Sequence, residues 1–387
     1  MRADESVAGE VTEPMQTATN RAAASPLASV PRRTVRLFEP LALRSVTLPN
    51  RIMMSPMCQY SSDDGTPTDW HLVHLGSRAV GGAGLVMVEA TAVERRGRIS
   101  PGDSGLYDDK HVEPLARIVC FIREQGVVAG IQLAHAGRKA SVHAPWLGGK
   151  PLQPAEGAWE TVSASAVPFD AGWHTPRALS RAEIRDVVGA WVAAAQRALA
   201  AGFQVVEIHL AHGYLAHQFY SPYANRRDDE YGGSFDNRVR FALEIARAVR
   251  EVWPERLPLF ARLSCTDWEP GYWDLEQAVE LSRRLGELGV DLIDASSGGN
   301  VPNARIPLGP AYQTPFAERI RRETGLRTAA VGLITSPELA EEILANERAD
   351  LIALGRALLR DPYWPLHAAT ALGADVPWHP QYERAKP

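Results

Sequence analysis

The stretch QVVEIHLAHGY, residues 204–214, joins a largely apolar run to a polar end that contains two histidines and a tyrosine. Apolar residues that follow one another without strict alternation are typical of a parallel strand buried on both faces. The preceding segment, 180–202, has helical spacing, with Ser180 as its cap and Gly202 as its stop. The stretch therefore predicts one strand of an α/β domain that ends in functional side chains.

Seven further runs of the same kind occur along the chain, with helical spacing in the segments between them. They are RIMMSPM (51–57), GLVMVEA (84–90), VVAGIQL (127–133), PLFARLS (258–264), DLIDASS (291–297), RTAAVG (327–332) and DLIALGR (350–356). Eight strand-and-helix units over roughly 320 residues predict a (β/α)8 barrel. A doubly wound sheet is the alternative architecture, but no G-x-G-x-x-G motif follows the first strand.

The chain also has parts that do not follow this repeat. Residues 1–33 are rich in Ala, Ser, Thr and Pro, and we expect a disordered extension before a barrel at 34–370. Residues 138–178, after the third strand, are rich in Pro, Gly and Trp and predict a lid or pocket wall on the catalytic face. Residues 371–387 form a tail beyond the last barrel helix.

Composition narrows the class of protein. The chain has 387 residues and a formal net charge of −5, which argues against a nucleic-acid partner, and we interpret the basic run at 94–98 as solvated surface. Its three cysteines, Cys58, Cys120 and Cys265, are too widely spaced for a disulfide framework or a metal cluster. Without a signal peptide or a run long enough to cross a membrane, we expect a cytoplasmic protein.

Polar and glycine residues follow nearly every predicted strand, which is where barrels carry their functional groups. After the last two strands, Gly332, Gly355 and Arg356 are suited to a phosphate, because glycine lets backbone N–H groups approach an anion that arginine can grip.

His209 and His212 leave three interpretations open. A metal site would need more ligands, for which the strand ends offer only Glu89 and Asp294, and the H-E-x-x-H motif is absent. Two structural histidines are the second interpretation. In the third, both rings donate N–H groups to a substrate oxygen beside Tyr214 as a proton source, and we favour this one.

Several motifs together carry a resemblance to a known family. They are SPMCQY (55–60), HLAHGYL (209–215), SPYANRRDDEYGGSFDNRVRF (221–241), GRALLRDP (355–362) and QYER (381–384). With them, residues 35–384 resemble the old yellow enzymes, flavin-dependent ene-reductases. The match is closest to the thermophilic-like branch, which includes bacterial NADPH dehydrogenases and xenobiotic reductases.

The resemblance implies a non-covalent FMN on the catalytic face of the barrel. The residues that it assigns to the flavin are Ser55, Pro56, Met57 and Cys58 along the ring, Ala90, Gln132 and Arg262 at the ring edge, and Gly332, Gly355 and Arg356 at the phosphate.

The resemblance also implies a reaction. NADPH or NADH reduces the flavin, and an electrophilic alkene with a carbonyl or nitro group then receives the hydride. His209 and His212 would hold the substrate oxygen, Tyr214 would supply the proton and Tyr60 would add a hydrogen bond. In a homodimer, or an oligomer built from dimers, the tail at 371–387 would lie at the subunit interface, and Arg384 would reach the neighbouring subunit's site. The rival functions are a metal-dependent barrel hydrolase, which would use the histidine pair, and a non-catalytic flavin-binding module.

Overall fold

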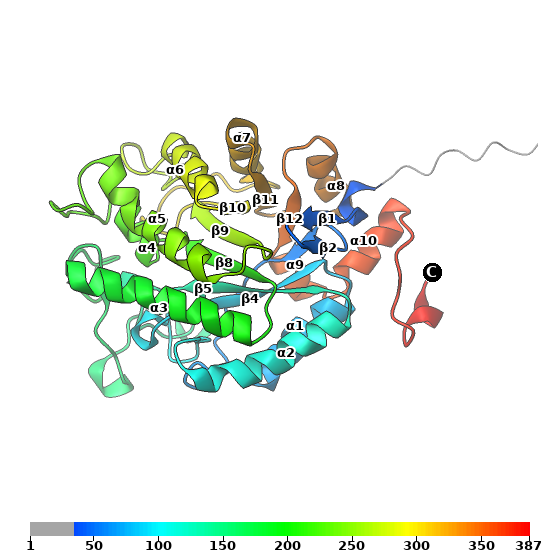
Figure 1. Cartoon of the computed structure of the whole chain (residues 1–387), viewed down its shortest axis with the longest axis horizontal. Coiled ribbons are helices and arrows are strands. Elements are labelled where there is room, and N and C mark those ends of the chain that lie inside the picture. Colours follow the sequence, from blue (N-terminus) through cyan, green and yellow to red (C-terminus); the bar gives the residue numbers. More distant parts are fainter. Residues whose placement is uncertain (1–34) are drawn as a thin grey trace, which may run out of the picture. The chain divides into compact units, whose positions relative to one another are not determined.

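Eight parallel strands form a closed barrel in the computed structural model, which describes residues 35–387 (Figure 1). Each of the eight predicted runs overlaps one of these strands, and the predicted (β/α)8 fold is confirmed. The predicted extension at 1–33 lies outside the described residues. In chain order the barrel strands are β3 (Ile52–Met54), β4 (Leu85–Ala92), β5 (Val128–Ala134), β8 (Val205–Leu210), β9 (Leu259–Ser264), β10 (Leu292–Ser296), β11 (Arg327–Val331) and β12 (Leu351–Leu354).

Helices surround the barrel (Figure 1). Their ends follow the predicted caps: the Ser180 hydroxyl accepts the N–H of Glu183, whose carboxylate in turn accepts the N–H of Ser180. None of the helices in residues 35–387 combines the length and apolar character that a membrane crossing requires. The helices are α1 (Asp69–Val80), α2 (Val112–Glu124), α3 (Arg181–Ala200), α4 (Leu215–Tyr220), α5 (Phe235–Val252), α6 (Leu275–Glu287), α7 (Thr314–Thr324), α8 (Pro337–Ala345), α9 (Arg356–Arg360) and α10 (Trp364–Leu372).

A short antiparallel hairpin precedes the barrel and was not predicted. It consists of β1 (Leu41–Leu43) and β2 (Val46–Leu48), in which buried and exposed residues alternate. Strands of three residues are too short for their period to stand out in the sequence.

The segment after β5 lies where the sequence predicts it and has little regular structure. It contains two two-residue strands, β6 (Val162–Ser163) and β7 (Arg177–Ala178), which pair in parallel. The short 3-10 helices of the chain are η1 (Arg36–Phe38), η2 (Arg95–Gly97), η3 (Asp109–His111), η4 (Gly137–Lys139), η5 (Pro145–Leu147), η6 (Pro154–Glu156) and η7 (Glu383–Ala385).

Candidate active site

The carboxyl ends of the barrel strands bring the predicted histidines and tyrosine together. His209 lies near the end of β8, His212 follows in the turn, and Tyr214 is the N-cap of α4. The His209 ring centroid lies 5.0 Å from that of His212 and 5.1 Å from that of Tyr214, with interplanar angles of 80° and 85°. The His209 ring therefore makes an edge-to-face contact with each of these two rings.

In the turn that carries His212, the backbone passes close to the loop after β10. His212 has a φ of 59° and the next residue, Gly213, has a φ of 72°, both in the left-handed region. A Cβ on Gly213 would lie 2.1 Å from the carbonyl oxygen of Gly299. Glycine at 213 thus lets the histidine turn pack directly against the loop after β10.

Each histidine has one ring nitrogen engaged by the protein. His209 Nδ1 accepts the N–H of Ala211 at 3.2 Å, which assigns the proton to Nε2. His212 Nε2 lies 2.7 Å from the Oγ of Ser296, at the end of β10. Within residues 35–387, neither Nε2 of His209 nor Nδ1 of His212 has a hydrogen-bond partner. One nitrogen of each ring is therefore available to a ligand.

Burial keeps both imidazoles neutral. It lowers the pKa of His209 and of His212 well below the usual value, and the nearby positive charge of Arg262 lowers both further. A neutral ring whose second nitrogen is engaged as an acceptor presents one N–H donor and no charge. The pair is thus suited to an oxygen that gains negative charge during a reaction.

Tyr214 and Tyr60 are protonated phenols in an apolar surrounding. Burial raises the pKa of Tyr214 and of Tyr60 well above the usual value, and it raises that of the Cys58 thiol as well. These three side chains pack against a small apolar cluster that includes Ile99 and Ala136. Cys58 is accordingly a neutral thiol here, without the nucleophilic thiolate form.

Some polar side chains inside the barrel have buried atoms without a hydrogen-bond partner among the described residues. Gln132 Nε2 donates to Glu207 Oε1 at 2.7 Å, and Arg262 Nε lies 3.2 Å from Asp294 Oδ2. Glu207 Oε2 and Asp294 Oδ1 are buried without a hydrogen-bond partner in the described part of the chain. Burial, reinforced by the charge of Asp294, raises the pKa of Glu207 to about 8. Arg262 Nε also lacks a hydrogen-bond partner among the described residues, so this predicted ring-edge residue keeps an unused donor, which fits the polar edge of a flavin.

The predicted phosphate residues surround one cavity between the ends of β11 and β12. The cavity measures about 250 Å³ and includes Gly332, Gly355 and Arg356 in its lining. A Cβ on Gly332, where φ is 116°, would meet Gln313 and Tyr312 at 2.9 and 3.0 Å. A Cβ on Gly355 would meet only Met57 Sδ, at 3.6 Å, so the backbone of Gly355 is open on the cavity side. This cradle fits an anion with its charge beside the exposed Arg356.

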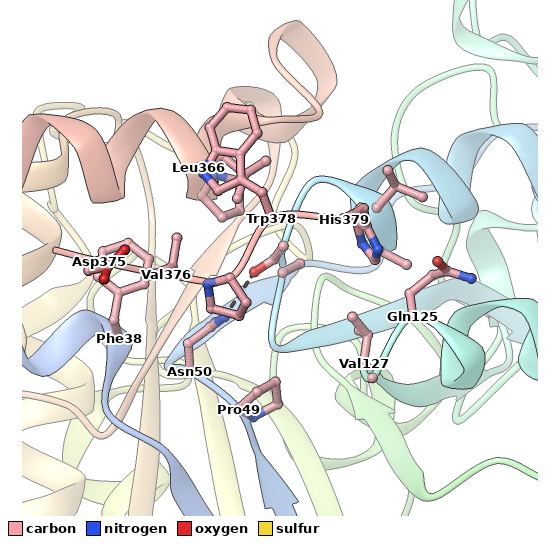
Figure 2. A pocket seen from close by; sticks show the side chains of 17 residues that line it. Phe38, Pro49, Asn50, Gln125, Val127, Leu366, Asp375, Val376, Trp378 and His379 are labelled. Atoms are coloured by element: carbon pink, nitrogen blue, oxygen red, sulfur yellow. Dashed lines mark hydrogen bonds between the residues drawn. The ribbon is translucent and has the colours of Figure 1, made fainter. Parts of the chain in front are cut away.

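The C-terminal tail does not lie near the candidate active site of its own chain. Trp378 and His379 line a cavity of about 380 Å³ together with Pro49, Gln125 and Val127, which precede barrel strands, so the tail lies at the amino end of the barrel (Figure 2). Arg384 is exposed. His209, His212 and Tyr214 thus lie together, and Gly332, Gly355 and Arg356 line one cavity, whereas the tail that carries Arg384 lies at the amino end of the barrel.

Some residues of the site were not predicted. Lys139 Nζ donates to the carbonyl oxygens of His212 at 3.0 Å and Gly299 at 2.9 Å, and so holds the histidine turn. Its Nζ lies 5.2 Å from the Tyr214 ring centroid, and burial lowers its pKa to about 8. Nothing local in the sequence marks Lys139. Glu207, in contrast, had a signal, since a carboxylate stands inside an otherwise apolar strand.

Comparison with known proteins agrees with this geometry. Residues 36–374 match the model of the NADH:flavin oxidoreductase / NADH oxidase family. A protein of Geobacillus thermodenitrificans (strain NG80-2) named NADPH dehydrogenase is 50% identical over 350 residues, which cover 90% of this chain and 98% of that protein.

Solved structures share the fold. Morphinone reductase has a TM-score of 0.73 and 28% identity, covering 91% of this chain and 94% of that chain. The old yellow enzyme homologue from Zymomonas mobilis has a TM-score of 0.72 and 25% identity, covering 91% and 99%. The chain therefore belongs to the NADH:flavin oxidoreductase / NADH oxidase family, that of the old yellow enzymes, and is an NAD(P)H-dependent flavin oxidoreductase.

Proposed function

We propose that this chain is an FMN-dependent ene-reductase that acts on α,β-unsaturated carbonyl and nitro compounds. When bound, FMN accepts a hydride from NADPH or NADH and delivers one to the β-carbon of the substrate. The observation that carries the proposal is the pair of neutral, buried histidines, each with one free ring nitrogen, beside a protonated tyrosine.

The histidine pair binds the oxygen of the substrate. His209 donates from Nε2 and His212 from Nδ1, and Ser296 donates its hydroxyl proton to Nε2 of His212 to maintain that tautomer. Negative charge develops on the oxygen as the β-carbon gains hydride, and two fixed donors in a dry site stabilise this charge more than they stabilise the neutral substrate. Tyr60 adds a third hydrogen bond to the oxygen.

Tyr214 protonates the α-carbon. Its pKa lies well above the usual value because it is buried, so the phenol holds its proton until the substrate becomes basic. Lys139, 5.2 Å from the ring, offsets part of the cost of forming the phenolate.

The residues of the phosphate cavity and those at the carboxyl ends of the other barrel strands hold the cofactor. Gly332, Gly355 and Arg356 bind the phosphate, while Gln132 and Arg262 bind the ring edge. Ser55, Pro56, Met57, Cys58 and Ala90 line the ring. A single phosphate cradle favours FMN over a dinucleotide flavin.

The proposal also covers the oligomeric state of the enzyme, its location in the cell and its electron donor. The enzyme acts in the cytoplasm as a homodimer, with NADPH as its donor. Arg384 of each chain then completes the substrate pocket of the other, because the tail lies at the amino end of its own barrel. The alternative, a metal-dependent hydrolase, has no support from the family match.

The first test is the identity of the bound flavin. The purified protein should be yellow and should release FMN on denaturation. Arg356→Ala should lower FMN retention about ten-fold, whereas Arg322→Ala, at an exposed position on α7, should leave it unchanged. Recovery of FAD, or a colourless protein that FMN does not reconstitute, would contradict the proposal.

A further inference from the structure

An open groove lies beside the active site, between η2 and the segment after β5. It has a volume of about 360 Å³ and is lined by Arg95, Arg96, Arg98, Gly157 and Trp159. This volume lies within the range of small-molecule sites in proteins. The proposed reaction assigns no function to these residues.

The groove has an excess of positive charge. Asp64 Oδ1 lies 3.0 Å from Arg95 Nη2 and 3.4 Å from Arg98 Nη1, and its Oδ2 lies 2.9 Å from Lys110 Nζ. Three cations thus share one carboxylate. Arg95 is the most accessible of them, with 69% of its side chain exposed, so it can turn toward a bound anion.

Arg96 differs from its neighbours in this respect. Its Nε lies 2.5 Å from Glu94 Oε1, and its Nη1 lies 3.9 Å from Glu183 Oε1. Glu94 therefore compensates the charge of Arg96, while Glu183 is bonded mainly to Arg177 and adds little. Arg96 thus contributes less than Arg95 to the positive charge of the groove.

An aromatic wall stands beside these charges. Trp159 Nε1 donates to the carbonyl oxygen of Arg96 at 3.0 Å, and the Arg98 guanidinium lies 5.4 Å from the Trp159 ring centroid. The indole is thus held in place by one hydrogen bond and one cation–π contact. Such a surface is suited to stacking with a nucleobase.

The groove is within reach of the catalytic groups. Gly97 and Ile99, in the same stretch of chain, line a small void together with Tyr214. Arg95 is four residues from Ile99, and a chain spans at most ~3.6 Å per residue, which places the groove within ~15 Å of that void. A dinucleotide in an extended conformation covers this distance.

We propose that this groove binds the adenosine end of NADPH, with Arg95 holding the 2′-phosphate and Trp159 stacking on the adenine. The inference rests on the proposed function, since it takes NADPH as the electron donor. NADH lacks the 2′-phosphate and is identical in the rest of the molecule. The groove therefore discriminates between the two donors, as arginines do in other NADP sites.

The test compares both donors with the FMN-loaded enzyme. Arg95→Ala should lower kcat/KM for NADPH about ten-fold, through KM, and leave that for NADH within about two-fold. Arg96→Ala is the matched control in the same groove and should change neither value by more than about two-fold, because Arg96 is already neutralised.

Binding without turnover gives an independent measurement. In calorimetric titration of the wild-type enzyme, 2′,5′-ADP should bind about ten-fold more tightly than 5′-AMP, and Arg95→Ala should abolish the difference. Equal losses with NADPH and NADH, or no loss with either, would overturn the assignment. If the wild-type protein contained FMN but oxidised neither donor, the proposed function would fail, whereas a donor-independent effect of Arg95→Ala would refute the groove alone.

Discussion

At the scale of single residues, the site depends on which nitrogen of each histidine the protein occupies. A backbone N–H occupies His209 Nδ1, and the hydroxyl of Ser296 lies against His212 Nε2. The backbone N–H selects the His209 tautomer, the proposed function has Ser296 donate to His212, and burial removes the charged form of both rings. Two predictions follow from this arrangement and from the state of Tyr214.

Ser296→Ala should weaken the binding of a phenol ligand about ten-fold, because His212 then loses the partner that maintains its tautomer. The change can be measured by titrating the flavin absorbance with the phenol. Ser282→Ala, which removes another buried serine hydroxyl on α6, is the control and should leave binding unchanged. An unchanged affinity in Ser296→Ala would show that Ser296 does not orient the ring.

Tyr214→Phe should slow reoxidation of the reduced enzyme by cyclohexenone about 10²- to 10⁴-fold, the usual contribution of a general acid. Reduction of the flavin by NADPH should remain nearly unchanged, because that half-reaction takes no proton from Tyr214. Stopped-flow absorbance separates the two half-reactions. Slowing confined to the NADPH half-reaction would contradict the assignment.

At the scale of elements, the segment 138–178 is fastened by one buried arginine. Arg138 Nη2 donates to the carbonyl oxygen and Oδ1 of Asn300, at 2.7 and 2.9 Å. Its Nη1 donates to the carbonyl oxygens of Val167 and Pro168. Arg138 thus ties this segment to the loop after β10, in addition to hydrogen bonds that other residues of the segment make, such as that from Trp159 Nε1 to the carbonyl oxygen of Arg96.

Arg138→Ala should destabilise the protein by about 3 kcal/mol or more, because it leaves several buried acceptors without a donor. It should also speed proteolytic cleavage within 138–178. Arg177→Ala, in the same segment but on the surface, should cost less than about 1 kcal/mol. Urea unfolding and limited proteolysis measure the two effects, and equal costs for both variants would contradict the anchoring function of Arg138.

Helix α1 carries a pH-dependent contribution to stability. His74 is buried, its Nε2 has no partner in the described structure, and burial lowers its pKa to about 3. The unfolded chain binds a proton near pH 6.5 while the folded chain does not, so stability decreases as pH falls from about 6.5 toward 3. Between pH 7 and pH 5 the loss should be about 2 kcal/mol.

His74→Asn should remove this part of the pH dependence. Urea unfolding of wild type and variant at pH 7 and pH 5 gives the double difference, in which the contributions of other titrating groups cancel. A pH dependence identical in both proteins would mean that folding does not lower the pKa of His74.

At the scale of the whole molecule, the tail at 371–387 lies at the amino end of the barrel, while the histidines lie at the carboxyl end. A dimer that contains two different variant chains can therefore test whether Arg384 acts in the active site of the partner subunit. We expect a dimer of one Tyr214→Phe chain and one Arg384→Ala chain to have about half of the wild-type activity. One of its sites carries both defects, and the other carries none.

Co-expression with two affinity tags isolates the mixed dimer, and steady-state rates with cyclohexenone measure it. If Arg384 acted within its own chain, each site would carry one defect and the activity would stay low. Deleting 378–387 should raise the substrate KM and loosen the dimer in sedimentation velocity, while the barrel still binds FMN. A truncated protein with unchanged assembly and KM would show that the tail is a simple terminus.

The sequence by itself determined the barrel and the central group of the site. Eight apolar runs mark the strands because a buried parallel strand needs apolar residues over its whole length, a property that is local and visible. His209, His212 and Tyr214 lie within six residues, so their proximity also follows from the chain itself. The hairpin β1–β2 had no such signal, because its strands are too short.

Only the tertiary structure decided what surrounds this group. Ser296 and Lys139 reach His212 from 84 and 73 residues away in the chain, and Gly332 and Gly355 line one cavity only because β11 pairs with β12. Tautomers and pKa values arise from such contacts and from burial, which depend on how distant strands close into a barrel. Sequence periodicity reports the environment along one strand, whereas the chemistry of the site depends on neighbours across several strands.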